Sequence, residues 1–481
     1  MAYKHGVYVS EVPTSIIPAV NTTAGLPVVF GTAPIHLAKD RAMANKPILC
    51  HSYEEAVSQL GYSDDWDTYT LCEVMTSQFA LYNRGPVVFV NVLDPEKFKK
   101  TEASKEVHIT DKVAKIEAPV LLESLNVKKL SAGESLKAGV DYEASYDAEG
   151  VLNITVLEGG QVHEASSLFV DYNALDPSKV NAEAVIGGID IASGKSTGLE
   201  CLNKVFSLTG LVPGLILAPG YSDDPKVAAV MTAKATNING HFTAMVLLDV
   251  PASTVTKYTD VKKWKDDNNY TAPNQVVCWP MVKLGDDIYH MSTHALGVLA
   301  QTDSKNGDIP YESPSNKSMQ CNGICLADGK EVILGTDEAE YLNGQGIVTA
   351  INFIGGWKLF GNRTACYPAN TDPKDCFISI RRMFMWHAQT FIQTYWQKLD
   401  QPINKRLIQT VVDSENIRLN GLKAQGAILG GRVEFYEDEN PVTNLIDGIV
   451  KFHTYITPPA PAREIDNVLE YDPSYFSSLF K

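Results

Sequence analysis

One stretch contains several of the residue types of a phosphate-binding loop. Ser193-Gly194-Lys195-Ser196-Thr197 places a glycine, a lysine and hydroxyl residues in consecutive positions. Such a loop also needs a glycine six residues before the lysine, where the backbone approaches the phosphates, and Ile189 occupies that position. Gly188 is one position too early. The stretch is therefore interpreted as a surface turn rather than a nucleotide site.

Two residue pairs have the spacing of metal ligands. His290 and His294 stand at positions i and i+4, as zinc ligands on a helix do. Met291 replaces the glutamate that a metalloprotease needs after the first histidine, and no third ligand is indicated. Cys321 and Cys325 have no second close cysteine pair after them. Two histidines on a helix face are the better interpretation, and no metal is expected.

Paired carboxylates occur three times, but each pair adjoins residues that are typical of turns. They are Asp223–Asp224, Asp266–Asp267 and Asp286–Asp287. Solvated turns account for these pairs without an acid–base role. The chain contains no Gly-x-Ser-x-Gly motif, and no cysteine–histidine arrangement follows from spacing. No catalytic residue and no cofactor are predicted, which favours a structural protein over an enzyme.

The composition argues against several classes of protein. The chain has 481 residues, of which 57 are acidic and 41 basic, giving a net charge of −16. Direct nucleic-acid binding is not expected, because phosphate neutralisation needs clustered lysine and arginine and no basic tract is present. No apolar segment reaches the roughly 20 residues of a transmembrane helix, and no signal-peptide pattern is found. The eight scattered cysteines predict reduced thiols in a cytosolic product.

Alternating strands and helices predict an α/β domain that is discontinuous in sequence. In residues 21–95, buried-strand patterns occur at Leu26–Ala33 and Val87–Val92. Amphipathic helices lie between them, and the first begins with a capping pattern at Ser52. The same alternation returns in residues 191–345. The predicted fold class is α/β and α+β multidomain, with a helix-covered mixed sheet as its core.

Residues 96–190 interrupt this alternation. Long helical periods vanish there, and short alternating runs appear, of which Leu152–Leu157 is the clearest. This pattern predicts a small β domain inserted into the first domain. We expect it on the outer surface, because an insertion at a loop tip leaves the hydrogen bonds of the core intact.

Residues 346–457 predict a C-terminal α+β domain. Apolar residues between Ile380 and Tyr395 recur at helical spacing, so a long helix should present one apolar face. Arg381 and Arg382 open this helix, where the macrodipole disfavours cations, so an acidic partner is expected on this chain or on another subunit. Two helical segments and two strands should follow, at Lys405–Val412, Ser414–Ala424, Arg432–Tyr436 and Gly448–Ile456.

Each end of the chain carries a segment that is able to pair as a strand. Residues 1–20 alternate weakly between Tyr3 and Val12, and prolines follow. Residues 458–481 begin with a proline-rich connector and continue through Ile465–Tyr471. By pattern alone, the first segment fits either an edge strand of its own domain or a strand donated to a neighbouring subunit.

Short motifs spread along the chain share their order with a known family. The central motif runs from Trp357 through Gly361, Arg363 and Thr364 to the pair Arg381-Arg382. Others occur at Gly6–Glu11, Thr197–Leu199, Ala218–Gly220, Asp400–Asn404 and Pro461–Ile465. Together they resemble contractile tail sheath proteins, the outer cylinders of contractile phage tails and of related bacteriocin particles. The resemblance touches both ends and the core, and leaves roughly residues 96–190 uncovered.

The resemblance implies a function. A sheath subunit would form hexameric rings stacked around an inner tail tube, and would contract from a metastable extended state to drive the tube through a cell envelope. Its partners would be other copies of itself, the tail tube protein, and baseplate and tail terminator proteins, with no direct nucleic-acid contact and no membrane insertion. It would belong to a virion tail or phage-tail-like particle assembled in the cytoplasm of a bacterial host, and would need no cofactor.

The resemblance also implies roles for the two ends of the chain. Residues 1–20 and 458–481 would act as arms that pair with neighbouring subunits and complete a sheet in the C-terminal domain, which faces the tube. The arm strands would contain Gly6, Val7, Tyr8, Val9, Glu11, Ile465, Val468 and Leu469, and the acceptor strand Val450, Phe452 and Thr454. Contact with the tube should be polar, and five basic side chains are hypothesised to make it, namely Lys405, Arg406, Arg418, Lys423 and Arg432.

Two other classes of protein stay open. An α/β enzyme would place its site at the turn after Ala218-Pro219-Gly220 or Asp249-Val250-Pro251, because such sites lie at the carboxyl ends of parallel strands. A pocket with perturbed titratable groups would favour it. A static capsid or baseplate component would instead show no second assembled state.

Overall fold

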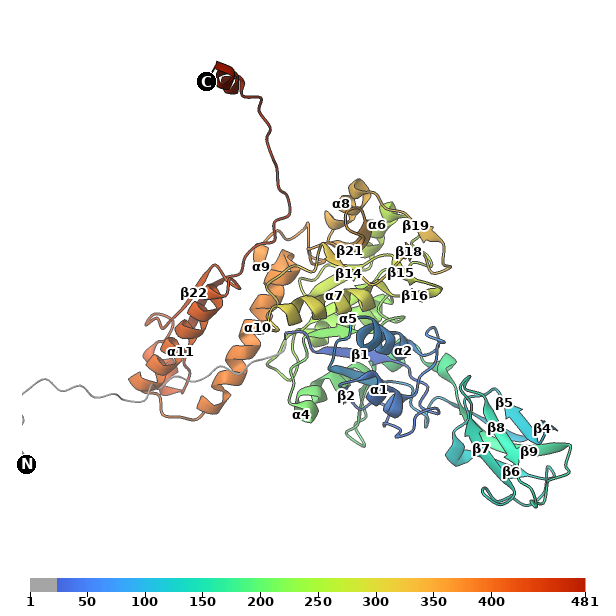
Figure 1. The fold of residues 1–481 in the computed structure, drawn as a ribbon. Coiled ribbons are helices and arrows are strands. Elements are labelled where there is room, and N and C mark those ends of the chain that lie inside the picture. The colour runs from blue at the N-terminus through green and yellow to red at the C-terminus, as the bar shows by residue number, and fades with distance from the viewer. Residues whose placement is uncertain (1–23, 481) are drawn as a thin grey trace, which may run out of the picture.

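A nine-stranded mixed sheet runs through the centre of residues 24–480, which are the residues that the computed structural model describes (Figure 1). In spatial order its strands are β17 (Lys317–Ser318), β21 (Trp357–Phe360), β20 (Ile347–Asn352), β14 (Gln275–Cys278), β13 (Met245–Asp249), β12 (Leu215–Leu217), β1 (Pro27–Gly31), β3 (Val87–Asn91) and β2 (Ile48–Cys50). The strands from β20 to β3 are parallel, and the others add antiparallel edges.

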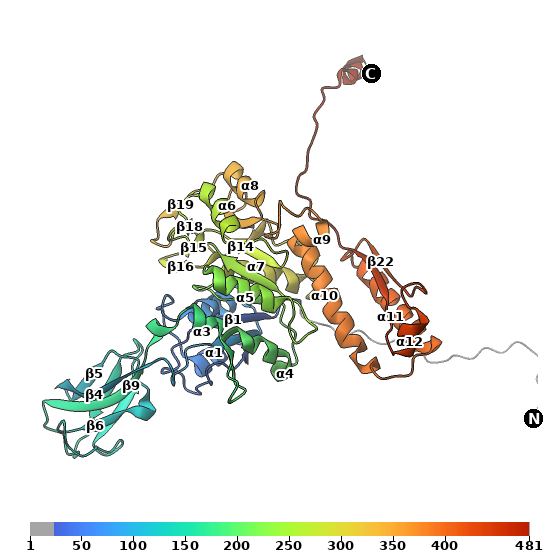
Figure 2. The same ribbon diagram turned by 180° about the vertical axis from the view of Figure 1, so that it is seen from behind.

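The parallel strands are short apolar runs that are buried on both faces. Every residue of β1, β3 and β13 is buried, as expected where helices cover both sides of a sheet. The helices of this part are α1 (Tyr53–Leu60), α2 (Thr70–Met75), α3 (Ala182–Ile186), α4 (Val205–Thr209), α5 (Pro225–Ala235), α6 (Tyr258–Asp267), α7 (Met291–Lys305) and α8 (Thr336–Asn343). Seen from behind, α5 and α3 cover the opposite face from α2 and α7 (Figure 2).

The first helix begins and ends where the sequence predicts. Ser52 Oγ accepts a hydrogen bond from the Glu55 N–H at 3.2 Å and caps α1. Gly61 ends the helix with φ +74°, a conformation in which a Cβ would lie 2.2 Å from the Pro34 carbonyl oxygen. α2, in contrast, continues without interruption as a π-helical segment, Thr76–Leu81.

Residues 99–175 form a separate antiparallel sheet, which we call the β unit. Its strands, in spatial order, are β6 (Asn126–Lys128), β9 (Ser167–Leu175), β4 (Lys99–Thr110), β5 (Val113–Ile116), β8 (Leu152–Val156) and β7 (Tyr142–Tyr146). Alternating side chains such as Leu152, Ile154 and Val156 are buried in a core that belongs to this unit. The unit projects from one end of the molecule (Figures 1 and 2).

Two smaller sheets border the central one. One is the hairpin of β10 (Gly188–Ile189) and β11 (Ser196–Thr197), whose turn contains Lys195. The phosphate-loop candidate is therefore part of a hairpin turn. The other sheet has the order β16 (Asp287–Tyr289), β15 (Met281–Leu284), β18 (Gly323–Cys325) and β19 (Glu331–Val332).

The C-terminal part is built on two long helices and a two-stranded sheet. Its elements are α9 (Pro373–Cys376), α10 (Ile378–Tyr395), α11 (Lys405–Ala424), β22 (Gly430–Glu434), α12 (Val442–Ile446) and β23 (His453–Thr457). α11 is one helix rather than the two segments predicted, because Asn404 caps it and no glycine or proline interrupts residues 405–420. Among residues 24–480, no helix has the length and apolar character needed to cross a membrane.

β23 begins later than predicted. Gly448 adopts φ +82°, and the Asn440 side chain accepts a hydrogen bond from the Lys451 N–H at 2.7 Å. Both features hold the chain in a loop up to Lys451, so Val450 and Phe452 precede the strand and only Thr454 of the predicted acceptor residues lies in it.

The cations that open α10 are compensated on the same chain. Arg382 Nη1 donates to Asp303 Oδ1 on α7 at 2.9 Å, Nη2 contacts Oδ2, and both side chains are nearly excluded from solvent. Arg382 Nη2 also lies 3.4 Å from the Ala24 carbonyl oxygen. Arg381 pairs with Asp375 at 3.3 Å. The expected acidic partners are thus found, and neither comes from a second subunit.

We predict that Arg382→Met destabilises the protein by about 3–5 kcal/mol, because it leaves the Asp303 charge buried and unpaired. Chemical denaturation of the full chain measures this. Lys262→Met is the matched control, since Lys262 and Asp266 form an exposed pair whose loss should have little effect on stability.

The double variant Arg382→Met/Asp303→Leu should recover much of the loss, because it removes both buried charges together. Equal losses of unfolding free energy for Arg382→Met and Lys262→Met would contradict the role given to the Arg382–Asp303 pair.

Candidate functional site

The predicted acceptor sheet is small and has an open edge. β22 pairs with β23 from Gly430–Thr457 to Glu434–His453. α11 covers one face, where the Asn416 side chain accepts from the Val433 N–H at 2.9 Å and donates to the Val433 carbonyl at 3.0 Å. Among residues 24–480, no third strand pairs with β22 or β23. The outer edge of β23 therefore presents main-chain groups that another strand can use, whereas the Asn416 side chain already occupies those of Val433 on the outer edge of β22.

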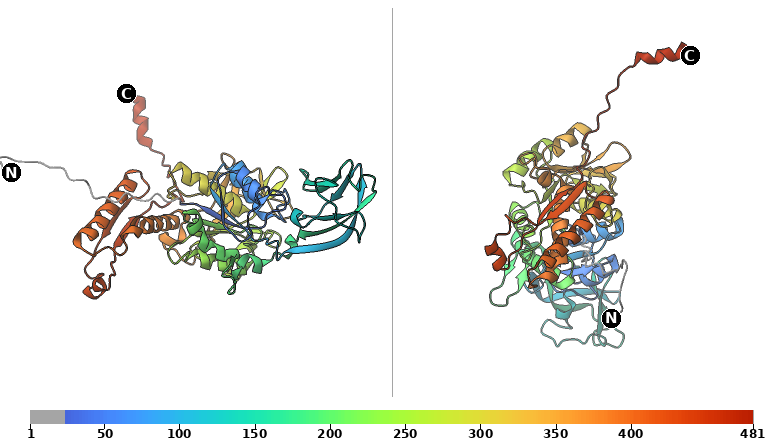
Figure 3. Two further views of the ribbon diagram at one scale, coloured as in Figure 1. Left: turned by 90° about the horizontal axis from the view of Figure 1, so that it is seen from below. Right: turned by 90° about the vertical axis from the view of Figure 1, so that its left-hand side faces the viewer.

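The C-terminal arm forms no strand with any part of residues 24–480. Residues 458–472 have no regular structure, and Ile465, Val468 and Leu469 are exposed. Figures 1 and 3 show the arm running away from the molecule. The predicted N-terminal arm residues Gly6, Val7, Tyr8, Val9 and Glu11 lie outside the described residues.

The five basic residues hypothesised to face the tube do not share one environment. Lys405, Arg406 and Lys423 are exposed along α11. Arg432 is also exposed, beside Glu434 at 2.6 Å and over the Tyr455 ring at 3.9 Å.

Arg418 does not belong in this group. Its guanidinium contacts Glu415 at 2.7 Å and His387 Nδ1 at 2.5 Å, between α11 and α10. Burial and the Arg418 charge lower the pKa of His387 to about 3, so this imidazole stays neutral. Arg418 therefore joins two helices instead of facing a partner, and the helix position alone gave no sign of the histidine on α10.

The central motif of the sequence forms a folded corner of the chain. The Arg363 guanidinium lies between the rings of Tyr367, at 4.2 Å, and Phe377, at 3.8 Å. Gly361 has φ +144°, and a Cβ there would lie 2.9 Å from Val348 Cα. Thr364 Oγ1 donates to the Asp375 carbonyl at 2.7 Å. Trp357 lies in β21, so the motif connects the edge of the central sheet to α10.

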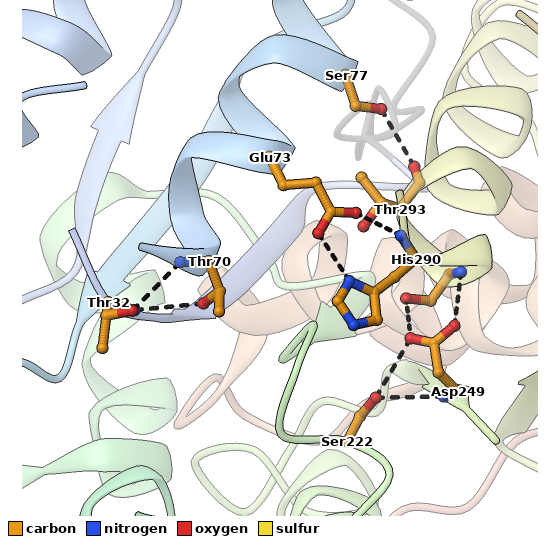
Figure 4. A network of polar contacts seen from close by, with 9 residues as sticks. Thr32, Thr70, Glu73, Ser77, Ser222, Asp249, His290 and Thr293 are labelled. Atoms are coloured by element: carbon orange, nitrogen blue, oxygen red, sulfur yellow. Dashed lines mark hydrogen bonds and ion pairs between the residues drawn. The ribbon is translucent and has the colours of Figure 1, made fainter. Parts of the chain in front are cut away.

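A buried polar network lies at the carboxyl ends of the parallel strands (Figure 4). Glu73 on α2 accepts from the His290 N–H at 2.7 Å and contacts His290 Nδ1 at 2.7 Å. Asp249, the last residue of β13, accepts from the Ser292 N–H at 2.9 Å and from the Ser222 hydroxyl at 3.4 Å. We call these residues the Glu73–His290 network. It was not predicted, because Glu73 and His290 are far apart in sequence.

The network borders an acidic cleft of about 880 Å³. Burial alone would lower the pKa of His290, but the charges of Glu73, Asp249 and Asp223 raise it to about 10. Burial would likewise raise the pKa of Glu73, yet its contacts with His290 hold that pKa below the usual range. His290 therefore carries a positive charge at neutral pH, and it precedes α7 rather than lying on a helix face as predicted.

These electrostatics do not fit a general-base role for His290. A protonated His290 cannot accept a proton, and the hydroxyl groups of Ser222 and Ser292 bond to Asp249 rather than to it. Among residues 24–480, no group of three or more histidine, cysteine or acidic side chains could hold a metal ion. The network instead connects α2, β13 and the start of α7.

The chain is 26% identical over 490 residues to the tail sheath protein of Burkholderia phage BcepMu, covering 99% of this chain and 98% of that relative. This match extends over almost the whole of both chains and supports a contractile tail sheath family. The chain's relatives are structural sheath proteins rather than enzymes. No family model matches the chain.

Solved sheath structures share the fold. The sheath of the extracellular contractile injection system PVC, in its contracted state, has a TM-score of 0.57 and 14% identity, covering 99% of each chain. The anti-feeding prophage baseplate, solved with six-fold symmetry, also gives 0.57 at 14% identity, covering 98% of this chain and 100% of the other. The chain is thus a contractile sheath subunit of a phage or phage-like injection system.

We predict that Glu73→Gln destabilises the protein by about 3 kcal/mol near pH 6, because it removes the hydrogen-bonded partner of the partly buried His290 charge. The folded pKa of His290 is raised, so its contribution is full below about pH 6.5 and is lost as the pH rises through about 10. The folded pKa of Glu73 is lowered, so its contribution is lost as the pH falls below about 4.5.

The stability difference between the wild type and Glu73→Gln should therefore shrink on both sides of pH 5–6.5. Thermal unfolding from pH 4 to pH 10 measures it, with Lys262→Gln as the control for an exposed pair. A difference that does not change with pH would show that Glu73 acts through packing alone.

Proposed function

We propose that this sheath subunit polymerises as stacked hexameric rings around a tail tube through arms exchanged between neighbours. The open edge of β23 carries the proposal, together with an exposed arm that has no strand partner among residues 24–480. β-Augmentation requires these two features on interacting copies, and here one chain carries both. The six-fold symmetry of the similar baseplate structure supports rings of six.

Arm exchange fits a sheath that changes length. Each main-chain hydrogen bond contributes only about 0.5–1.5 kcal/mol net, but several in a row hold two subunits together. The prolines at 458, 459 and 461 stiffen the connector, so it acts as a tether. The globular parts can then exchange their lateral contacts without separation. Contraction from a metastable extended state requires a larger or better-matched contracted interface, and it would drive the tube through a cell envelope.

The proposal assigns a separate role to each domain of the chain. Residues 21–95 and 191–345 are assigned to the discontinuous core domain, residues 96–190 to the outer β domain and residues 346–457 to the tube-facing domain, with arms at 1–20 and 458–481. The boundary at residue 345 needs one correction, because β20 and β21 pair within the central sheet and move residues 347–360 to the core domain. The separate core of the β unit and its place at the end opposite the C-terminal sheet support an outward position (Figure 1). Assembly in the host cytoplasm with tube, baseplate and terminator proteins completes the proposal.

Val468→Pro should abolish polymerisation, because it removes a main-chain donor in the middle of the arm strand. Val468 is exposed and outside any regular element, so the monomer should keep its thermal stability. Negative-stain electron microscopy of the full chain gives the readout, and deletion of residues 1–20 tests the other arm in the same way.

Val468→Thr is the matched control, because threonine keeps both the donor and a β-branched side chain and should still form tubes. Tubes of normal length from Val468→Pro would contradict pairing by this arm.

Charge reversal tests the tube-facing surface. Lys405→Glu/Arg406→Glu/Lys423→Glu should reduce sheath loading on the tube at least about tenfold, because contacts between charged surfaces reverse sign. Sheath polymerisation without tube should be unchanged. Co-sedimentation with purified tube protein at low salt measures loading.

The matched control reverses exposed lysines of the central part, Lys226, Lys257 and Lys330. Equal loading by the two triple variants would remove Lys405, Arg406 and Lys423 from the tube interface.

A further inference from the structure

The last described residues form an apolar element beyond the arm strand. Pro473–Phe480 folds as a 3₁₀ helix, η6. Four of its large side chains, Tyr475, Phe476, Leu479 and Phe480, are each more than half exposed. Figure 3 shows η6 at the tip of the arm, away from the rest of residues 24–480. Clustered exposed apolar side chains of this kind mark a surface that another molecule covers.

A second apolar surface lies beside the acceptor sheet. α12 is in the connection from β22 to β23, and its Val442 and Ile446 are 70% and 82% exposed. Ile449 follows α12 and is also half exposed. We call these three residues the α12 patch. The Asn440 side chain donates to the carbonyls of Tyr436 at 2.8 Å and Lys451 at 2.9 Å, which fixes the patch to one end of the sheet.

We infer that η6 of one copy packs on the α12 patch of the neighbour that accepts its arm strand, an inference that rests on the proposed arm exchange. Chain length supports it. Tyr475 follows Tyr471, the end of the arm strand, by only four positions, and four extended residues span at most about 14 Å. Once the strand is paired, η6 must therefore lie at one end of the acceptor sheet.

The position of the patch determines the direction of the donated strand. A strand antiparallel to β23 ends beside His453, at the end of the sheet that carries α12. A strand parallel to β23 ends beside Thr457, where the neighbouring exposed apolar residue is Leu429, whose N–H donates to the Thr457 carbonyl at 2.8 Å. The α12 end offers three exposed apolar side chains against one, so the donated strand runs antiparallel to β23.

Charge agrees with this arrangement. The loop around α12 carries Glu437, Asp438 and Asp447, whereas residues 473–480 contain no charged side chain. Packing η6 on the patch thus places no charged side chain of η6 against these carboxylates, and the nearest acidic residue of the arm is Asp472, directly before η6. The arm then has two attachments of different kinds, since main-chain pairing holds its strand and apolar packing holds its tip.

Disulfide trapping between two single variants tests the inference. Ile446→Cys and Phe476→Cys are purified separately, mixed, assembled into tubes and oxidised with diamide. We expect a cross-linked dimer on a non-reducing gel, with a peptide joining positions 446 and 476 identified by mass spectrometry. Tubes assembled from either variant alone measure the background of cross-linked dimer. This background includes any disulfide with the native cysteines, which are buried or half-buried.

Leu429→Cys mixed with Phe476→Cys is the matched control for direction, and it should give no cross-link above background. A 429–476 cross-link in place of 446–476 would overturn the inference and reverse the strand. Tubes without a 446–476 cross-link would also overturn it while leaving arm exchange in place. Wild-type chains that form no tubes would overturn the proposed function, and the inference with it.

A second variant keeps the test independent of cysteine chemistry. Phe476→Ser/Phe480→Ser should raise the concentration needed for half-maximal tube assembly about tenfold or more, because burial of two aromatic side chains is lost. Leu208→Ser, at an exposed apolar position on α4, should leave it unchanged. Equal assembly by both variants would count against packing of η6.

Discussion

One buried ion pair determines how the C-terminal part is joined to the central sheet. Arg382 on α10 and Asp303 on α7 are nearly excluded from solvent, and Arg382 also reaches the Ala24 carbonyl. Because neither charge is tolerated there alone, α10 has to begin where the two meet. Further along α10, Met383 and Trp386 pack in one apolar cluster with Leu419 of α11 and Val433 of β22. The position of the β22–β23 sheet thus follows from the contact between Arg382 and Asp303.

Patterns among neighbouring residues predicted the strands and the helix start whose formation depends on those neighbours. Buried β-branched runs became β1, β3 and β13, and the Ser52 cap began α1, because burial and capping depend on neighbours in sequence. The late start of β23 is different. The Asn440 side chain holds Lys451 from eleven residues away, so the alternation from Gly448 to Ile456 indicated a longer strand than the chain forms.

The roles of charged residues depended on neighbours that are distant in sequence. Arg418 lies on a helix whose other basic residues are exposed, yet His387 on α10 gives it a buried partner. Glu73 and His290 come together only because α2 and the start of α7 meet at the carboxyl ends of the parallel strands. That place is where an α/β enzyme holds its site, but here the charges keep His290 protonated and the side chains fixed. A site can therefore have the location of an active site and serve only to connect elements.

The chain enters and leaves the β unit at adjacent positions. Lys99 at the start of β4 pairs with Leu175 at the end of β9, and the Asp176 N–H donates to the Phe98 carbonyl at 2.9 Å. The unit has its own core, so a short turn joining these positions would leave the central sheet complete. Evolution, or a protein engineer, can therefore exchange this module for another of any size whose ends lie equally close. With the proposed outward position of the β unit, the outer surface of the particle can change independently of the parts proposed to assemble it.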